Sequence, residues 1–337
     1  MKIFFYSTVF APSVGGIETL VETLCRQFVA LGHEVTVATE TQGAADMPFP
    51  VARRPGRGRI RELLTWCDVH VQANVSLKAA WVWLVAPRKT IYQHNNVYQR
   101  DDGTKRVVDR LKTALAHATP GIAVSTYTAA RTGAEHVILN AYDDATFGPA
   151  PEWAEKDRDL VFLGRLVSQK GCDTLIDALG RLAARGHRPG LKVVGDGPDR
   201  EALARQSAEA GVADQVTFQG KLTGRALAAE LARHRVMVVP SRYEEPFGIV
   251  ALEGLASGCV PVVSERGGLK DAIGGHGFTF PNGDAAALAD RLEEVLRDME
   301  AAHRRLDGVD AHLSQCRARA VAENYIAVFE QHLGHRA

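Results

Sequence analysis

Short apolar runs alternate along the whole chain with longer amphipathic segments. The short runs are rich in β-branched and aromatic residues, as in "KIFFYS" at 2–7 and "VPVVS" at 260–264, and turn-forming residues separate them from the longer segments. Strands that alternate with helices in this way are typical of a parallel sheet covered by helices. The sequence therefore predicts an α/β protein.

The predicted strands fall into two series. The first half contains strands at 2–7, 34–39, 68–73, 89–94, 121–125 and 136–139. The second half contains strands at 160–164, 191–195, 216–220, 236–240, 260–264 and 277–280. Between residues 140 and 159 the pattern lapses into a segment rich in Pro, Asp and Ala, which predicts an inter-domain linker. We therefore expect two doubly wound domains, at 1–150 and 151–315.

The bulk composition narrows the class of protein. The chain has 337 residues, 46% of them hydrophobic, and a formal net charge of zero, which gives no support for nucleic acid as the main partner. The five cysteines are scattered and form no C-x-x-C pair, so neither a disulfide framework nor a zinc site is expected. The longest apolar run, at 79–87, is too short to span a bilayer, and the N-terminus leads straight into a strand without a signal peptide. We expect a cytoplasmic protein.

Residues that can carry chemistry follow the predicted strands. Ligands of open parallel sheets bind beyond the carboxyl ends of the strands, and two such sheets facing each other would form a central cleft. After the first strand, Gly15 and Gly16 open a helix, where they form either a tight turn or a close approach to a ligand. After the first strand of the second half, the loop 164–171 carries Arg165 and Lys170. These are either solvated charges or a phosphate-binding pair.

The segment "EEPFGIVALEG" at 244–254 holds two carboxylates around a predicted helix N-terminus. Pro246 suits a chain that enters a helix, so we predict a helix beginning near Phe247, with Glu245 in the loop and Glu253 in the second turn. Such an N-terminus can hold an anion, while the carboxylates can accept hydrogen bonds from ligand hydroxyls. The alternative is a capped helix with two solvated glutamates.

Two features of the first half remain open. His94 ends a strand in "YQHNN" and is either structural or faces the expected cleft. The tract "RRPGRGRIR" at 53–61, with five arginines and no acid, is either a solvated loop or a contact for an anionic membrane surface or acceptor.

Together these segments resemble the retaining glycosyltransferases of family four, which have the GT-B fold. The resemblance runs through "PSVGGIETLVETLCRQFVALGHEVTVAT", "GRLVSQKGCDTLIDAL", "LKVVGDGPDREAL", "PSRYEEPFGIVALEGLASGCVPVV" and "GGLKDAIGGHGFTFPNGD". It implies two Rossmann-like domains facing a central cleft. It also implies a last helix, at about 316–337, that packs back onto the first domain.

The resemblance also implies roles for single residues. Arg165 and Lys170 would bind the donor diphosphate, Glu253 the ribose, and Glu245 the transferred sugar, with His94 contacting the donor from the first domain. The residues expected to act in catalysis are His94, Arg165, Lys170 and Glu245. The residues expected to bind the donor are Gly15, Gly16, Gly164, Gly195, Pro246, Phe247, Gly248, Ile249, Val250 and Glu253.

The expected reaction moves a hexose-type sugar from a UDP, GDP or ADP sugar to a saccharide, lipid-linked or small-molecule acceptor, in polysaccharide, lipopolysaccharide or other glycoconjugate biosynthesis. The "DRD" at 157–159 sits in the predicted linker, so we expect no metal and no cofactor beyond the nucleotide sugar. The segment 42–135 matches the family only loosely, which leaves the acceptor open. Two alternatives remain: a nicotinamide-dependent oxidoreductase, which lacks its G-x-G-x-x-G fingerprint here, and a non-catalytic two-lobed binding protein.

Overall fold

The structure, a computed structural model, describes residues 1–13, 15–100, 103–148 and 152–334. It divides into two compact units: unit 1 comprises Met1–Ala141 and Gln315–Ala337, and unit 2 comprises Tyr142–Ser314. The predicted domain boundary at 150 and 151 lies outside the described residues. The division falls instead after Ala141, where the linker-like sequence begins.

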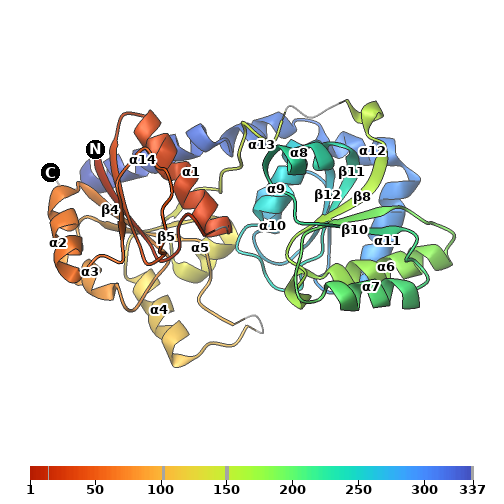
Figure 1. The fold of residues 1–337 in the computed structure, drawn as a ribbon, viewed down its shortest axis with the longest axis horizontal. Helices are drawn as coiled ribbons and strands as arrows, with labels where there is room; N and C mark the ends of the chain where they lie inside the picture. The colour runs from red at the N-terminus through yellow and green to blue at the C-terminus, as the bar shows by residue number, and fades with distance from the viewer. Residues whose placement is uncertain (14, 101–102, 149–151, 335–337) are drawn as a thin grey trace. The chain divides into compact units, whose positions relative to one another are not determined.

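Unit 1, whose chain runs from red to yellow in Figure 1 apart from its last helix in blue, is built on a parallel sheet with the strand order β3-β2-β1-β4-β5-β6-β7. Its strands are β1 Lys2–Ser7, β2 Glu34–Thr39, β3 Val51–Arg53, β4 Val69–Ala73, β5 Thr90–His94, β6 Gly121–Ala123 and β7 His136–Val137. Its helices are α1 Gly16–Ala30, α2 Arg57–Trp66, α3 Ala80–Val85, α4 Val107–His117, α5 Thr126–Thr132 and α14 Ala318–Gly334.

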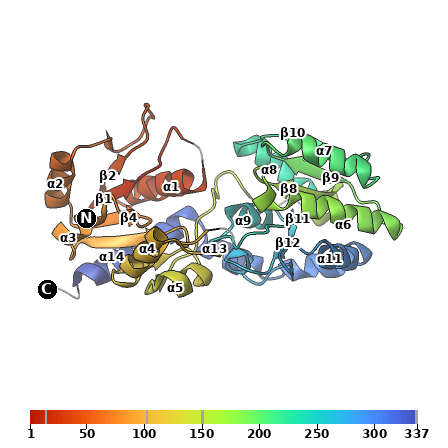
Figure 2. The ribbon, with the colours of Figure 1, turned by 90° about the horizontal axis from the view of Figure 1, so that it is seen from below.

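Unit 2 is built on a second parallel sheet, with the order β10-β9-β8-β11-β12-β13 (Figure 2). Its strands are β8 Arg158–Leu163, β9 Leu191–Val194, β10 Val216–Gly220, β11 His234–Val239, β12 Val260–Ser264 and β13 Phe278–Phe280. Its helices are α6 Cys172–Ala184, α7 Arg200–Glu209, α8 Gly224–Ala232, α9 Ile249–Ala256, α10 Leu269–Ile273, α11 Ala285–Arg297, α12 Met299–His303 and α13 Val309–Gln315. Single 3-10 turns lie at Trp153–Glu155, Ser168–Lys170 and Arg304–Leu306.

The predicted strands are all present, each within two residues of its expected ends. The prediction of a loop for the basic tract 53–61 is wrong. Arg53 ends the edge strand β3, Arg54 follows it in the connecting loop, and Arg57, Arg59 and Arg61 belong to the first turns of α2. This helix forms because Ile60, Leu63 and Leu64 are spaced for one face and pack beneath it, while the arginines stay on the outer side.

The last helix, α14, packs on α1 and completes the core of unit 1 (Figure 1). Tyr325 and Phe329 are fully buried, and the ring of Phe28 from α1 lies 5.8 Å from the ring of Phe329. The side-chain amide of Gln93, on β5, donates a hydrogen bond of 2.9 Å to the hydroxyl of Tyr325. Because burial of each such ring stabilises the fold by about 1.5–3 kcal/mol, the end of the chain is an integral part of unit 1.

The five cysteines are free and buried, as expected for small apolar core residues. Across the part of the chain that the structure describes, no helix is long and apolar enough to cross a membrane.

Candidate active site

The two motifs of the second half meet at the carboxyl edge of the unit 2 sheet. The chain proceeds outward from β8 to β9 and β10, and in the other direction from β11 to β12 and β13. The adjacent strands β8 and β11 therefore form a topological switch point, the position where ligands bind in open α/β sheets. The loop 164–171 follows β8 and the loop 240–248 follows β11, so both predicted motifs lie there.

The backbones of these two loops touch. The amide of Arg242 donates to the carbonyl oxygen of Gln169 at 2.9 Å. Gly171 has a φ of 70°, and a Cβ atom at this residue would lie 1.9 Å from the carbonyl oxygen of Pro240. Only glycine fits such a position. The loops are thus held against each other before any ligand arrives.

Lys170 and Glu245, which the sequence places 75 positions apart, form an ion pair between the loops. The Lys170 ammonium donates to Oε1 of Glu245 at 2.7 Å. The hydroxyl of Ser241 donates to the same oxygen at 2.6 Å, and the hydroxyl of Tyr243 donates to Oε2 at 2.9 Å. Glu245 is only 5% exposed, so its carboxylate is nearly surrounded by donors from the protein. It orients Lys170, and its own oxygens are largely occupied.

Arg165 contrasts with Lys170. Its side chain is exposed, and no acidic partner for it occurs within the described residues. Arg165 follows directly on Gly164, whose amide donates to the carbonyl oxygen of Val194. Across this contact, Gly195 has a φ of 144°, and a Cβ there would lie 1.8 Å from the oxygen of Gly164. The fold itself therefore requires Gly195, whereas the exposed guanidinium beside it is available to an anion.

The predicted helix start near Phe247 is wrong by two residues. Phe247 is buried, Pro246 lies in the preceding loop, and the helix α9 starts at Ile249, with Val250 next. The reason is Gly248, whose φ of 103° is left-handed and makes it the N-cap. Gly248 has no side chain to cap the helix, so the first amides of α9 are not satisfied by a side-chain cap and can hold an anion.

Glu253 lies in the second turn of α9, as predicted, and is half-buried. Burial and the nearby carboxylate of Asp143 raise the pKa of Glu253 to about 7. Within the described residues no side chain donates to this carboxylate. Its charge is therefore uncompensated in the ligand-free protein, unlike that of Glu245.

In unit 1 the predicted glycines lie at the start of α1, beyond β1. Gly15 is the N-cap, and a Cβ there would meet the carboxylate of Glu18, which also accepts a hydrogen bond from Ser13. Gly16 faces open space, and neither its backbone conformation nor its packing requires glycine. A glycine that the fold does not need favours the ligand-approach interpretation for this position.

The ring of His94 is completely buried, which favours the structural alternative over a side chain that faces a cleft. The Tyr98 hydroxyl accepts a hydrogen bond from the amide of Val75 and forms a second hydrogen bond, of 2.9 Å, with Nδ1 of His94. Nε2 lies against Gly121 and has no hydrogen-bond partner among the described residues. Burial and, to a smaller extent, the charge of His117 lower the pKa of His94 to about 4, so the imidazole is neutral.

The acids of "DRD" have structural partners. Asp157 pairs with Arg233, and Asp159 accepts a hydrogen bond of 2.9 Å from the amide of Gly190. Within the described residues no group of three or more His, Cys, Asp or Glu side chains is arranged to hold a metal ion.

Comparison with known proteins identifies the domain that carries this arrangement. Residues 144–306, which include both loops, Lys170, Glu245 and Glu253, match the model of the family described as glycosyl transferases group 1. Residues 144–306 belong to this family. The group 1 domain thus coincides almost entirely with unit 2.

The relatives that the chain matches differ in the activity that their names state. A glycogen synthase of Mycobacterium tuberculosis is 37% identical over 204 residues, which cover 57% of this chain and 48% of that protein, so the chain spans about half the length of this relative. A GDP-mannose-dependent alpha-(1-6)-phosphatidylinositol monomannoside mannosyltransferase of the same species is 26% identical over 89% of this chain and 90% of that protein.

Solved structures confirm the fold of the whole chain. An Anabaena protein in complex with UDP and glucose has a TM-score of 0.77 at 20% identity, covering 98% of this chain and 99% of that one. A sucrose-phosphate synthase from Thermosynechococcus elongatus has a TM-score of 0.79 at 21% identity, covering 99% of both chains. The predicted GT-B fold, with one Rossmann-like parallel-sheet domain in each unit, is confirmed.

Three residues that support the group 1 site were missed in the sequence. Ser241 and Tyr243 donate to Glu245, and Asn282 connects the loops after β11 and β12. The Asn282 amide donates to the carbonyl oxygen of Ser241 at 3.1 Å, and its oxygen accepts from the amide of Arg266 at 2.9 Å. A signal was present: Asn282 stands in "FPNGD" just after a predicted strand, at the carboxyl edge where site residues gather.

Proposed function

We propose that the protein is a retaining, metal-independent glycosyltransferase that moves a hexose-type sugar from a nucleoside diphosphate sugar to a saccharide, lipid-linked or small-molecule acceptor. The observation that carries the proposal is the switch point of the group 1 domain, where Arg165, Lys170 and the free amides of α9 come from adjacent loops. Two cations and a helix N-terminus suit a diphosphate. The match of residues 144–306 favours this function over the oxidoreductase and binding-protein alternatives.

In the proposed mechanism Arg165 and Lys170 stabilise the negative charge that develops on the departing diphosphate. This effect is larger in the transition state than in the ground state and therefore accelerates the reaction. Glu253 binds the ribose, since an ionised carboxylate can accept two hydroxyl donors and no side chain among the described residues donates to it. Glu245 holds Lys170 in place and sits just before the helix, where the transferred sugar would emerge from the diphosphate.

We infer retention of configuration from the resemblance to the retaining glycosyltransferases, and the motifs offer no second base placed to activate an acceptor for inversion. Front-face attack, in which the leaving phosphate accepts the proton of the acceptor hydroxyl, fits a site dominated by cations. An α-linked donor should then give an α-linked product, which the anomeric coupling constants of the product report by NMR. A β-linked product would refute retention.

The donor can be sought among UDP, GDP and ADP sugars. One relative uses GDP-mannose and one structural neighbour holds UDP, and neither fact decides for this chain. Thermal-shift titration with the three nucleoside diphosphates and with NAD separates the candidates, because a ligand at about 100 times its Kd stabilises the folded state by ~2.7 kcal/mol. Stabilisation by NAD alone would favour the oxidoreductase alternative.

The decisive experiment replaces the cations once the donor is known. Arg165→Ala and Lys170→Ala should each lower kcat/KM at least tenfold, which corresponds to ~1.4 kcal/mol of transition-state stabilisation. Arg205→Ala, an exposed arginine on α7, is the matched control and should leave kcat/KM unchanged. Near-normal turnover in both site variants would refute the assignment. Activity should also survive EDTA, and a loss that Mg²⁺ or Mn²⁺ restores would refute metal independence.

A further inference from the structure

Arg242 lies in the loop after β11, between two residues that support the site. Its neighbours Ser241 and Tyr243 donate to the carboxylate that pairs with Lys170. The guanidinium of Arg242 instead contacts the segment that carries this lysine, which comprises the 3-10 turn Ser168–Lys170 and the start of α6. The loop after β11 therefore contacts both the side chain of Lys170 and the backbone segment around it.

The Arg242 side chain makes three contacts, one before Lys170 in the sequence and two after it. Nη1 donates to the hydroxyl of Ser168 at 3.3 Å, Nη2 pairs with the carboxylate of Asp173, and Nε donates to the hydroxyl of Thr174 at 3.2 Å. The backbone amide of the same residue also donates to a carbonyl oxygen of the turn. Arg242 thus bridges both ends of the segment that carries Lys170.

This segment has few local interactions that would fix its shape. Among the described residues, no side chain caps the 3-10 turn, which follows Val167, or the helix α6, whose N-cap is Gly171. A side-chain cap normally stabilises a helix start by about 0.5–2 kcal/mol. The contacts of Arg242 therefore take the place of caps that the local sequence does not provide.

Arg242 differs from Arg165, the other arginine of these two loops. Each nitrogen of the Arg242 guanidinium has a partner in the protein. Arg165 is exposed and has no acidic partner within the described residues. A guanidinium whose nitrogens are already bound fixes structure, whereas an uncommitted one can bind an anion. We therefore expect the ligand to contact Arg165 but not Arg242.

The usefulness of Lys170 depends on the accuracy of its position. Its ammonium lies 2.7 Å from Oε1 of Glu245 and 3.2 Å from the hydroxyl of Tyr243. These contacts hold the end of the side chain, but its backbone is held by the turn. A displacement of about 1 Å in a catalytic group can cost on the order of a hundredfold in rate. A turn that has lost its external contacts would therefore weaken the action of Lys170.

We propose that Arg242 is a positioning residue, whose guanidinium fixes the turn that presents Lys170 to the diphosphate of the donor. Arg242 acts through Lys170 and does not touch the ligand. The inference rests on the proposed function, since it requires a diphosphate at this site. It assigns a role to the ion pair of Arg242 and Asp173, for which the sequence motifs gave none.

The partner Asp173 provides a test in which charge and position have opposite effects. Asp173→Ala removes a negative charge near an anion site, which by charge alone should strengthen the binding of a nucleoside diphosphate. If the ion pair positions Lys170, the same change should instead raise the Kd about threefold or more. The ligand is whichever of UDP, GDP and ADP gives the largest thermal shift, and titration calorimetry gives the Kd. A lower or unchanged Kd would overturn the proposal.

The second test combines Arg242 with Lys170. Arg242→Gln should raise the Kd about fivefold and lower kcat/KM about tenfold, and neither loss should exceed that of Lys170→Ala. In the Lys170→Ala background, Arg242→Gln should change either quantity less than about twofold, because it acts only through Lys170. Losses that multiply in the double variant would show that Arg242 contacts the ligand itself, which would overturn the proposal.

Hydrogen exchange separates this role from the proposed function. Peptides from residues 164–171 should exchange faster in Arg242→Gln than in the unmodified protein, whatever reaction the protein catalyses. Equal exchange would overturn the proposal and leave the proposed function intact. If none of the three nucleoside diphosphates binds the unmodified protein, the proposed function fails, and the role of Arg242 fails with it.

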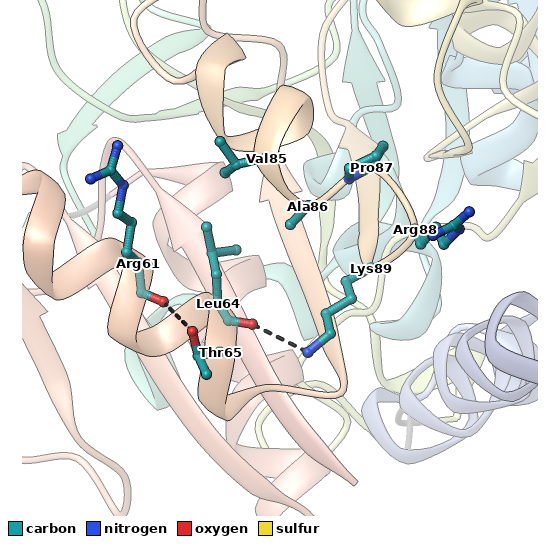
Figure 3. A pocket seen from close by; sticks show the side chains of 8 residues that line it. All are labelled: Arg61, Leu64, Thr65, Val85, Ala86, Pro87, Arg88 and Lys89. Carbon is teal, nitrogen blue, oxygen red and sulfur yellow. Dashed lines mark hydrogen bonds between the residues drawn. The ribbon is translucent and has the colours of Figure 1, made fainter.

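Two exposed arginines are the matched controls. Arg188 pairs with Asp214 at 2.8 Å in unit 2, outside both loops of the site. Arg61 lines a pocket of about 470 Å³ between α2 and the end of α3 in unit 1, whose basic side chains could attract the phosphates of a nucleotide (Figure 3). Arg188→Gln and Arg61→Gln should leave the Kd and kcat/KM unchanged, and circular dichroism verifies that each variant is folded. A loss in Arg188→Gln equal to that in Arg242→Gln would indicate a general charge effect, and a loss confined to Arg61→Gln would assign the nucleotide to the pocket; either result would overturn the proposal.

Discussion

Replacing Lys170 by Met tests whether Lys170 and Glu245 act as one unit. In the structure the Glu245 carboxylate receives hydrogen bonds from Lys170, Ser241 and Tyr243. The Met side chain keeps the length of Lys170 but removes the ammonium group. A nearly buried carboxylate would then retain two hydroxyl donors and lose its only cationic partner within the described residues.

The expected cost follows from these contacts. A hydrogen bond to a charged group contributes about 1.5–3 kcal/mol, and the two remaining donors limit the loss to about 2 kcal/mol. Glu245→Gln removes the charge but keeps an amide oxygen that accepts from Lys170 and Ser241, so it should cost about 1 kcal/mol. The double variant should cost about 2 rather than about 3 kcal/mol, because both single changes remove the same interaction. The coupling energy is then about 1 kcal/mol.

The assay is a double-mutant cycle on the free energy of opening, measured by hydrogen exchange of peptides from residues 172–184. Local exchange is preferable because a chain of two units need not unfold in a single transition. Arg158 and Glu230, a pair of 2.9 Å elsewhere in unit 2, provide the control: Arg158→Met should also lower stability but leave kcat/KM unchanged. Additivity within about 0.3 kcal/mol for Lys170 and Glu245 would refute the coupling.

Three further predictions concern the group 1 domain. In the folded protein the pKa of Glu253 lies above its ordinary value of 4.5, at about 7. Between these two pH values the native state binds more protons than the unfolded state. The free energy of unfolding therefore falls as the pH rises from 4.5 to about 7. Glu253→Gln should therefore stabilise the ligand-free protein at pH 8 by up to about 3 kcal/mol and leave it unchanged at pH 4, as urea unfolding at the two pH values would reveal. Calorimetric titration with the correct nucleoside diphosphate should give a Kd raised roughly tenfold or more for Glu253→Gln and nearly unchanged for Glu245→Gln, whereas equal losses in both would contradict their separate roles. Lys156 is almost completely buried, and its ammonium donates to the carbonyl oxygens of Ala232 and Ser257 at the ends of α8 and α9, so Lys156→Met should lower stability by about 2 kcal/mol while Lys192→Met, near the surface, changes it little.

The sequence predicts what depends on local pattern. Each long strand was visible as a run of β-branched and aromatic residues, because a strand buried on both faces must be apolar throughout. The edge strand Val51–Arg53 was not visible, since three residues between Pro50 and Pro55 show no alternation and are held only by pairing with β2. The start of α9 was displaced because Pro246 suggests a first turn, while the left-handed backbone of Gly248 decides it.

Contacts between distant segments were beyond the sequence pattern. The motif loops predicted cations and carboxylates at one edge of the sheet. They did not predict that Lys170 pairs with Glu245, whereas Arg165 has no acidic partner in the part of the chain that the structure describes. The burial of His94 depends on Tyr98 and Gly121, which pack around the end of β5. The sequence pattern at this strand end does not show whether His94 is buried or exposed. In each case the motif identifies the residue, but the sequence does not show which side chains pack around it.

The charge state of the site provides a physical argument for a ligand. A folded chain normally pairs its buried charges, and unit 2 does so for Lys170, Glu245 and Lys156. Glu253 departs from this rule. Its carboxylate lies partly buried beside Asp143, with no side-chain donor among the described residues, and this unfavourable environment raises its pKa. A diol that donates two hydrogen bonds to Glu253 would favour its ionised form and so remove this cost on binding. The carboxylate that destabilises the ligand-free protein should therefore increase the affinity for the ligand. The same residue thus links stability and recognition, and a stabilised Glu253→Gln variant with undiminished nucleotide affinity would break the link.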